Sequence, residues 1–383
     1  MAVFDNLRRY APALKQRFSP AAPFGIGLRL SARDVRELLE GDRLAEFRAW
    51  LDREGLYVAL INGFPYGTFH GTPVKADVYA PDWRDEARTA YTLNLIEALT
   101  RLLPDGMDGG VSTSPISYKA WMREAGDADW QRAAEHVARV AEALVHVRHA
   151  TGKVIHLDIE PEPDCSIENT DETIAFFEKW LALHGAPWLM ERLGCSLAAA
   201  HAAILEHVRV CFDCCHFAVE YEDPLRAIDR LRHHGIQIGR VQLSSAIRVD
   251  VPGDDAGRAA VVDRLRPFAD PVYLHQVVED HGAAALAHYP DLPQALAADG
   301  GQAAEWRIHF HVPLFTADYA GLGSTQPYVR QVIEAARAGG FTHHLEIETY
   351  TWDVLPGDLK IDLLDSISRE YDWVLSVLDA RRP

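Results

Sequence analysis

The stretch HLDIE at residues 156–160 decides the fold, because it is a short, mostly apolar run that closes on a carboxylate. Three other segments share this pattern: VCFDCCH at 210–216, VQLS at 241–244 and LEIE at 345–348. A charged or amide group that closes an apolar run is costly to order unless something compensates it. When several parallel strands of one chain end this way, a shared site at one end of a barrel explains all of them.

The rest of the chain alternates strand-like and helical segments from end to end. We expect eight strands, at residues 24–30, 57–62, 110–114, 154–160, 208–213, 238–243, 307–313 and 344–348. Apolar residues at helical spacing separate them, as between Ser31 and Gly55, where a capping-box-like start is followed by a glycine stop. This order predicts an α/β fold, a closed (β/α)₈ TIM barrel. No Gly-x-Gly-x-x-Gly follows the first strand, so the dinucleotide-binding fingerprint is missing.

We expect residues 1–383 to form a single TIM-barrel domain with two unusually long connections. The connection at 161–207 is predicted to hold two helices. The connection at 248–306 is predicted to hold a helix and a possible extra strand at 272–277. Long structured loops on the catalytic face of a barrel commonly act as lids or specificity elements.

The composition is that of an acidic globular protein, with a formal net charge of −18 over 383 residues. Such a chain repels phosphate backbones, so we expect neither a nucleic-acid partner nor binding to an anionic membrane surface. No secretory signal and no membrane span is visible. Three of the five cysteines crowd into residues 211–215, which suits a reducing compartment. We therefore expect a cytoplasmic protein; the sequence leaves its oligomeric state open.

The polar strand ends predict a metal site, because side chains at the C-terminal ends of barrel strands point toward the axis. Glu160, Asp213, Gln242 and Glu348 would converge there. Three carboxylates and one amide suit Mn²⁺, Mg²⁺ or Co²⁺, and carboxylate sites also accept Zn²⁺; we favour Mn²⁺. His216 is placed to contact a substrate hydroxyl or to act as another ligand.

Neighbouring carboxylates compete for two of these positions. Asp158 and Glu162 flank Glu160, and Glu346 precedes Glu348, so strand alternation puts each competitor on the same side as its rival. Position along the strand favours Glu160 and Glu348.

Further residues are candidates for substrate binding. His309 and His311 alternate to one side of the seventh expected strand, where both could face the pocket, or one could lie in the core and one at the rim. His70 and Lys75 lie on the long loop after the second strand, and a lysine there could contact an anionic group. Trp352, together with other aromatic residues, would line the pocket mouth or pack the upper barrel layer.

The strand-end pattern resembles the xylose isomerase-like TIM-barrel superfamily. That group has Glu ending strand four, Asp-x-x-His after strand five, a His or Gln after strand six and Glu ending strand eight, and it includes sugar isomerases and epimerases, hydroxypyruvate isomerase, inosose dehydratases and endonuclease IV. Other segments resemble the EboE family of bacterial metabolite traffic proteins, a branch of the same superfamily: NGFPYG at 62–67, FHG at 69–71, VK at 74–75, HFHVP at 309–313 and ETYTW at 348–352.

By position, the resemblance implies that Glu160 and Glu348 are both metal ligands and an acid–base pair. One carboxylate would remove a proton next to a carbonyl and the other would return it, while His216 would orient the substrate oxygen. The expected function is a divalent-metal-dependent sugar isomerase or epimerase acting on a small polyhydroxylated or keto metabolite.

Two alternatives stay open. The EboE resemblance implies a non-catalytic protein that binds a small molecule and hands it to a membrane-protein partner. An endonuclease IV-like phosphodiesterase would need several metals, more histidine ligands and a basic DNA-binding face, and the net charge of −18 argues against it.

Overall fold

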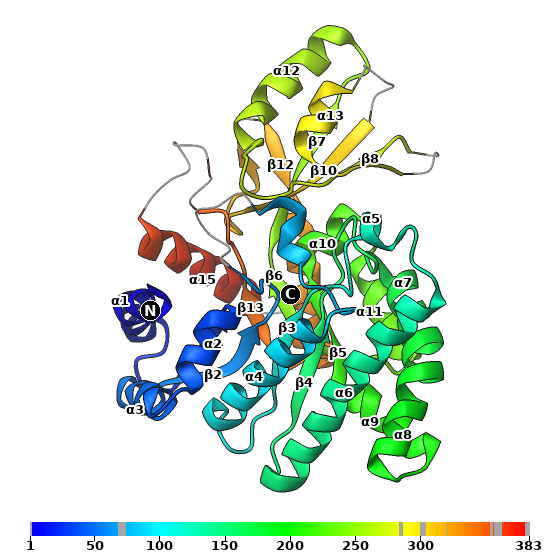
Figure 1. The fold of residues 1–383 in the computed structure, drawn as a ribbon. Helices are drawn as coiled ribbons and strands as arrows, with labels where there is room; N and C mark the ends of the chain where they lie inside the picture. Colours follow the sequence, from blue (N-terminus) through cyan, green and yellow to red (C-terminus); the bar gives the residue numbers. More distant parts are fainter. Residues whose placement is uncertain are drawn as a thin grey trace.

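The computed structural model describes residues 2–67, 74–282, 286–298, 304–319, 321–352, 355 and 362–379. Its centre is a parallel, seven-stranded α/β barrel (Figure 1). In sheet order the strands are β1 (Phe24–Arg29), β2 (Leu56–Asn62), β3 (Gly109–Thr113), β4 (Ile155–Ile159), β5 (Val208–Asp213), β6 (Ile238–Leu243) and β13 (Leu345–Ile347).

The last barrel strand, β13, lies close to the first, so the barrel is nearly closed. A Cβ added to Gly27 of β1 would collide with the Glu346 carboxylate of β13. Two residues further along each strand, the Arg29 guanidinium lies 3.2 Å from the Glu348 carboxylate. Side chains therefore bridge β1 and β13.

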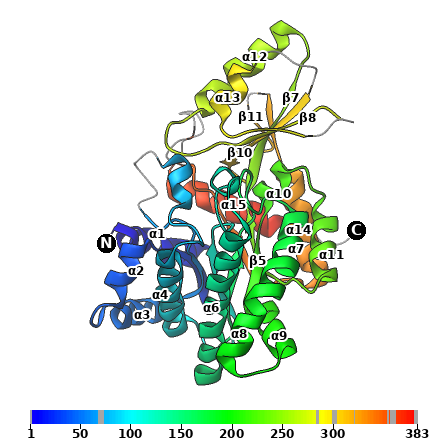
Figure 2. The ribbon, with the colours of Figure 1, turned by 45° about the vertical axis from the view of Figure 1, so that its right-hand side comes forward.

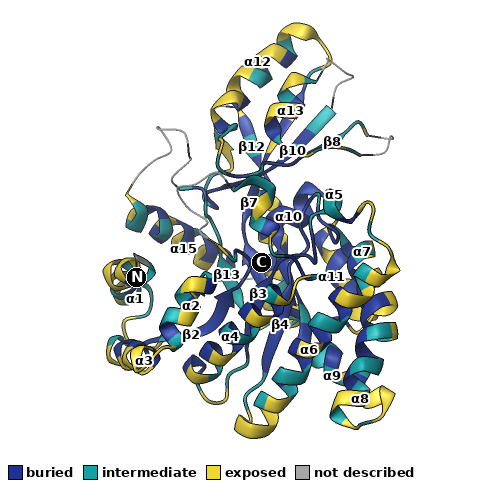
Figure 3. Cartoon of the chain, in the orientation of Figure 1, coloured by how far each residue is buried: buried dark blue, intermediate teal, exposed yellow. Residues whose placement is uncertain are grey.

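Helices cover the outside of the barrel, and their outer faces are the exposed parts of the molecule (Figure 3). They are α1 (Ala2–Phe18), α2 (Ala32–Leu39), α3 (Arg43–Glu54), α4 (Glu86–Leu102), α5 (Lys119–Met122), α6 (Asp127–Thr151), α7 (Thr170–Ala175), α8 (Ala186–Leu193), α9 (Leu197–His207), α10 (Cys214–Val219), α11 (Pro224–His233), α14 (Gln326–Gly339) and α15 (Leu363–Asp379), with the one-turn η1 (Lys75–Tyr79) and the π-helix η2 (Phe176–Gly185). None of the described helices is long and apolar enough to cross a membrane.

The predicted capping box is confirmed, since the Ser31 side chain and the Asp34 side chain each bond the other's backbone N–H. The single helix expected between Ser31 and Gly55 is instead two, α2 and α3. Gly41 between them adopts a φ of +58°, which a helix cannot continue through. Gly55 ends α3 in the left-handed conformation, as a glycine stop does.

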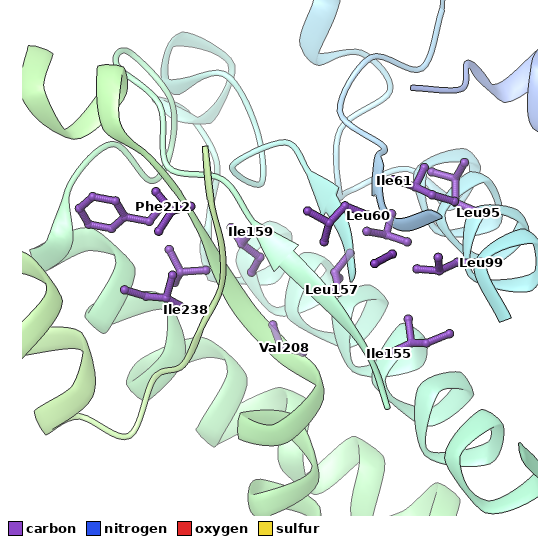
Figure 4. Close-up of a cluster of buried hydrophobic side chains, with 14 of the residues drawn as sticks. Leu60, Ile61, Leu95, Leu99, Ile155, Leu157, Ile159, Val208, Phe212 and Ile238 are labelled. Carbon is purple, nitrogen blue, oxygen red and sulfur yellow. The ribbon is translucent and has the colours of Figure 1, made fainter. Parts of the chain in front are cut away.

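Strand alternation in β4 explains why its sequence decides the fold. Ile155, Leu157 and Ile159 point outward and pack among apolar residues of the neighbouring strands and helices, including Leu95 and Leu99 of α4 (Figure 4). Each such buried side chain contributes about 1.5–3 kcal/mol to folding. The alternate residues of the same strand, which are polar, face the barrel interior.

A second, six-stranded antiparallel sheet stands beyond the C-terminal end of the barrel (Figures 1 and 2). Its order is β11 (Asp318–Tyr319), β12 (Leu322–Ser324), β7 (Ser245–Val251), β10 (Ala304–Val312), β8 (Val277–Asp280) and β9 (Ala287–Tyr289). The helices α12 (Asp255–Leu265) and α13 (Leu292–Ala297) and the short η3 (Arg266–Phe268) pack on it. Trp306, Ile308 and Phe310 belong to its own buried apolar cluster.

The expectation that residues 307–313 form the seventh barrel strand is wrong. They belong to β10, which runs antiparallel to β7 in the second sheet, while β13 pairs directly with β6 through Leu345 and Val241. Only Ser244 separates β6 from β7, so the chain continues past the barrel and pairs there with β10. Alternating apolar residues predict a strand with two different faces, but they do not determine which sheet it joins.

The two long connections also differ from expectation. In its described residues the second connection holds α12, η3, β8, β9 and α13 in place of one helix and one strand, and β8 begins at Val277, where the predicted strand at 272–277 ends. The first connection holds α7, η2, α8 and α9 in place of two helices.

Candidate active site

A cavity lies where the barrel meets the second sheet. Its lining comes from both parts of the fold: Arg29, Asn62, Phe64, Pro65, Val74, Lys75, Val78, Tyr79, Glu160, Glu162, His216, Tyr273, Leu274, His309, His311, Glu348 and Tyr350.

Glu160 and Glu348 reach the cavity because each extends its strand by one residue. The Glu160 N–H donates to the Thr113 carbonyl (3.1 Å), and the Glu348 N–H donates to the Leu243 carbonyl (3.0 Å). Burial, and then the nearby carboxylates of Glu348 and Asp213, raise the pKa of Glu160 well above its usual value. Burial and Asp213 raise the pKa of Glu348 to about 8. Two carboxyl groups in this environment resist being ionised together.

Asp213 caps α10 and connects β5 to the site. Its Oδ1 accepts hydrogen bonds from the His216 backbone N–H (2.9 Å) and the Ser244 hydroxyl (2.7 Å). His216 Nδ1 lies 2.8 Å from the Pro161 carbonyl, which can only accept, so Nδ1 carries the proton. Burial lowers the pKa of His216, and the neutral ring presents the Nε2 lone pair to the cavity.

β10 brings two more imidazoles to the same place. His309 Nδ1 lies 2.7 Å from Gln276 Oε1, and the Gln276 amide nitrogen donates to the Pro163 carbonyl, which fixes the amide orientation. His309 Nδ1 therefore carries the proton, and His309 Nε2 lies 3.1 Å from His216 Nε2, so that the lone pairs of the two nitrogens face each other. Two facing lone pairs repel each other unless a proton or a cation lies between them.

His311 completes the group from the same strand. Its Nδ1 donates to the Glu348 carbonyl (3.0 Å), and burial lowers its pKa to about 4. Its Nε2 is left without a hydrogen-bond partner in the described part of the chain. The ligand atoms of Asp213, His216 and His311 lie within 4.8 Å of one another.

Of the four predicted metal ligands, the structure brings Glu160 and Glu348 to the cavity, whereas Asp213 and Gln242 are fully buried and outside its lining. Asp213 still contacts the His216 backbone. Gln242 Oε1 accepts from the Cys211 thiol (3.0 Å), and its amide nitrogen has no partner among the described residues.

The competing carboxylates separate into two groups. Asp158 and Glu346 bind the fully buried Arg240, at 2.9 and 3.2 Å, and neither lines the cavity. Glu162 does line it; its carboxylate accepts from the Tyr79 hydroxyl (2.8 Å), and burial raises its pKa to about 8.

The remaining substrate-binding candidates have different positions. Lys75 lines the cavity, but its ammonium donates to the Asp270 and Tyr273 carbonyls and to Asp291 Oδ2. Trp352 packs against the apolar cluster of the second sheet and is not in the cavity lining. His70 lies outside the described residues.

Comparison with known proteins finds no matching family model and no matching curated protein. Similar solved structures include the probable 3-DHS dehydratase AsbF of Bacillus anthracis, with 12% identity over 93% of this chain and 89% of that chain and a TM-score of 0.42. An IolI protein with a bound zinc atom shows 10% identity over 93% and 90%, with a TM-score of 0.46. A xylose isomerase-like TIM barrel protein of Mycobacterium smegmatis in complex with magnesium shows 16% over 91% and 86%, at 0.46. Similarities this remote concern the barrel fold and carry no conclusion about this chain's activity.

Sequence reasoning missed four polar residues of the cavity: Arg29, Asn62, Tyr79 and Tyr273. Arg29 and Asn62 close β1 and β2, and both bond Glu348 Oε1, at 3.2 and 3.4 Å. The signal that singled out Glu160, a polar residue closing an apolar strand, was therefore present at both positions. Tyr79 lies on η1, and no pattern in the sequence connects it to Glu162.

Proposed function

We propose that this chain is a divalent-metal-dependent enzyme that moves a proton next to the carbonyl of a small polyhydroxylated or keto metabolite, as sugar isomerases and epimerases do. The observation that carries the proposal is the pair Glu160 and Glu348. Both carboxylates line one cavity, from β4 and β13, and each keeps one oxygen, Oε2, without a partner among the described residues.

The donor set fits a metal ion. Glu160 Oε2, Asp213 Oδ2, Glu348 Oε2 and His311 Nε2 are buried and unpaired within the described structure. The facing lone pairs of His216 and His309 add two nitrogen donors. We propose that ligands drawn from these groups hold a divalent cation, which when bound would polarise the substrate carbonyl. Because imidazole suits Zn²⁺, the histidines favour this ion over the Mn²⁺ preferred from carboxylates alone.

The residues of the chain supply the proton transfer. A general acid or base works best when its pKa lies near the working pH, and the raised pKa of Glu348, about 8, is in that range. Glu160, with its own raised pKa, would exchange the second proton. Arg29 and Asn62 hold Glu348 Oε1 and so orient Oε2 toward the cavity. The neutral Nε2 of His216 could accept a hydrogen bond from a substrate hydroxyl.

The test is metal-dependent exchange of carbon-bound protons with solvent. Protein loaded with Zn²⁺, Co²⁺ or Mn²⁺ would be incubated in D₂O with pentoses, hexoses, cyclic polyhydroxy ketones and hydroxypyruvate, and deuterium uptake followed by NMR. We expect uptake with at least one compound, and a loss of at least 100-fold in E160Q and in E348Q. E346Q, which alters a carboxylate outside the cavity lining, is the matched control. Uptake at the wild-type rate in E160Q and E348Q would contradict the proposal.

A second candidate is the traffic role of the EboE type, in which the chain binds a metabolite in the cytoplasm and hands it to a membrane-protein partner. The support for it is that Tyr273, Leu274 and residues of β10 line the cavity opposite the barrel strands. A ligand would therefore lie between the barrel and the second sheet. Such a protein would retain a ligand through purification, detectable by native mass spectrometry, and would give no deuterium uptake with that ligand.

A further inference from the structure

The opposite, N-terminal end of the barrel holds a second cluster of metal-ligating side chains. Asp108 immediately precedes β3, His156 is the second residue of β4, and His344 immediately precedes β13. The three come from separate strands, and none of them lines the active-site cavity.

His156 is the central member. It is fully buried, and its Nδ1 lies 2.5 Å from Asp158 Oδ1, to which it donates. Asp158 is held in turn by Arg240. The His156 Nε2 therefore carries a lone pair, and it has no hydrogen-bond partner among the described residues. A carboxylate that bonds one ring nitrogen of a histidine and leaves the other free is the usual support of a metal-bound imidazole.

The barrel makes room for this pair with two glycines. A Cβ added to Gly110 of β3, or to Gly239 of β6, would collide with both the Asp158 carboxylate and the His156 ring. The backbone therefore approaches His156 closely from two sides, so the ring is confined with its Nε2 directed toward Asp108.

Asp108 lies near this nitrogen, and His344 lies near Asp108. His156 Nε2 lies 3.9 Å from Asp108 Oδ2, and His344 Nε2 lies 3.1 Å from Asp108 Oδ1. All three ligand atoms lie within 4.8 Å of one another. Ligands of a tetrahedral zinc ion, each about 2.0–2.1 Å from the metal, are about 3.3 Å apart, so shifts of about 1 Å would suffice.

We propose that Asp108, His156 and His344 form a second metal site, for Zn²⁺ or a similar transition-metal ion, at the N-terminal end of the barrel. Two imidazoles and one carboxylate suit these ions, and a fourth position would be open to water or to the exposed His343, whose Nδ1 lies 3.7 Å from Asp108 Oδ1. Arg209 binds Asp108 Oδ2 at 3.3 Å, so the ion would take Oδ1, in place of the hydrogen bond that Oδ1 forms with His344 Nε2.

An ion at this site would stabilise β13, the strand that closes the barrel. β13 is three residues long, and its only strand partner in the described sheet is β6. An ion held by His344 together with Asp108 and His156 would tie the start of β13 to β3 and β4 across the barrel end. Binding energy gained only by the folded state appears as stability.

The test counts Zn²⁺ equivalents in the full-length protein. Metal-free wild type, H344Q and D108N would be equilibrated with Zn²⁺ against a chelator of micromolar affinity, which keeps weak surface sites empty. We expect each variant to bind one equivalent fewer than wild type and to show a smaller Zn²⁺-induced rise in Tm. H234Q, which removes a surface imidazole paired with Glu178, should behave as wild type.

The Zn²⁺ equivalent that H344Q and D108N lose can be distinguished from any equivalent bound at the active site. D213N would remove one proposed ligand at the other end of the barrel, so it should lose a different equivalent and retain the one that H344Q loses. If H344Q and D108N both bind as many equivalents as wild type, with the same rise in Tm, the cluster is an ordinary buried ion pair and the proposal fails. D108N preserves side-chain shape, so its result stands even if H344Q folds poorly.

Discussion

At the scale of single residues, the buried polar atoms without a partner determine what the site could do. A buried group of this kind costs about 1–3 kcal/mol unless a ligand satisfies it. The unpaired atoms of Glu160, Glu348 and His311 lie around one cavity. The unpaired Nε2 of His156 lies at the opposite end of the barrel. Residues such as Asp158 and Glu346, which share strands with them, are instead satisfied by Arg240.

The Ser244 hydroxyl should tune metal affinity at the active site through Asp213. It donates to Asp213 Oδ1 (2.7 Å) and accepts from the Cys215 N–H (2.9 Å), so it orients the carboxylate. We expect S244A to weaken Zn²⁺ or Co²⁺ binding about 10- to 100-fold, measured by competition with a chromophoric chelator. S245A, which removes the neighbouring buried hydroxyl facing Thr325, is the control. Equal affinities in S244A and wild type would show that Asp213 is not a ligand.

Glu370 should make stability depend on pH. It is buried on α15, accepts from the Thr349 hydroxyl and the Leu314 N–H, and burial raises its pKa from 4.5 to about 7. The folded state therefore holds a proton that the unfolded state loses, so stability falls as pH rises from about 4.5 to 7. The change is at most about 3 kcal/mol.

Urea unfolding of E370Q and wild type at pH 5 and pH 8 tests this. The amide cannot ionise, so the free energy of unfolding of E370Q relative to wild type should increase toward pH 8. E334Q, on the exposed surface of α14, controls for the loss of a carboxylate. A difference between E370Q and wild type that does not change with pH would contradict the assignment.

At the scale of elements, the residues of strand β4 contribute to three parts of the molecule. The outward residues of β4 pack into the apolar core, His156 and Asp158 occupy the lower barrel interior, and Glu160 reaches the cavity. This is possible only because β3, which pairs with β4, and β6, two strands away, carry glycine where the His156–Asp158 pair needs space.

Gly239→Ala should therefore destabilise the barrel, although replacing glycine by alanine inside a strand is otherwise stabilising. Its methyl group would overlap Asp158 and His156, which cannot move away without breaking their bonds to each other and to Arg240. We expect a loss of about 1–3 kcal/mol in the free energy of unfolding. Gly339→Ala at the end of α14, where a Cβ meets no atom within 4 Å, should be neutral or stabilising. Equal stability of G239A and wild type would disprove the close packing described for this pair.

At the scale of the whole molecule, the active site is shared between two separately packed parts. The barrel contributes the carboxylates, while the second sheet contributes His309 and His311 through β10. Each part has its own buried apolar cluster. The second cluster is much the smaller, so we expect the second sheet to open more readily than the barrel.

Trp306→Ala should reveal this division. Trp306 is fully buried in the second cluster, with the Arg258 guanidinium 5.3 Å from its ring centre, and its truncation costs about 3–5 kcal/mol locally. We expect faster hydrogen exchange in β7, β8 and β10 and weaker active-site metal binding, with β3 and β4 still protected. L157A, in the barrel cluster, should increase exchange in β3 and β4. If W306A increased exchange equally in both sheets, the two parts would unfold as one unit.

The sequence by itself determined the seven strands of the barrel and the polar residues that close them, although it also assigned to the barrel an eighth strand that belongs to the second sheet. Period-two alternation and helical spacing are local properties, and a chain that alternates strands and helices has few ways to bury its apolar faces. For the same reason the sequence alone places Glu160 and Glu348 at the C-terminal barrel end, and His309 and His311 on one face of their strand.

Only the tertiary structure decided where the strand at 304–312 belongs and what surrounds each charge. Strand pairing joins residues far apart in the chain, and alternation does not specify the partner, so β10 could not be assigned to the second sheet from its sequence. The same holds for Arg240, which satisfies Asp158 and Glu346, and for Asp108, which meets His156 and His344. Whether a buried polar group is a ligand or a neutralised partner depends on what packs beside it, and three-dimensional packing alone determines that.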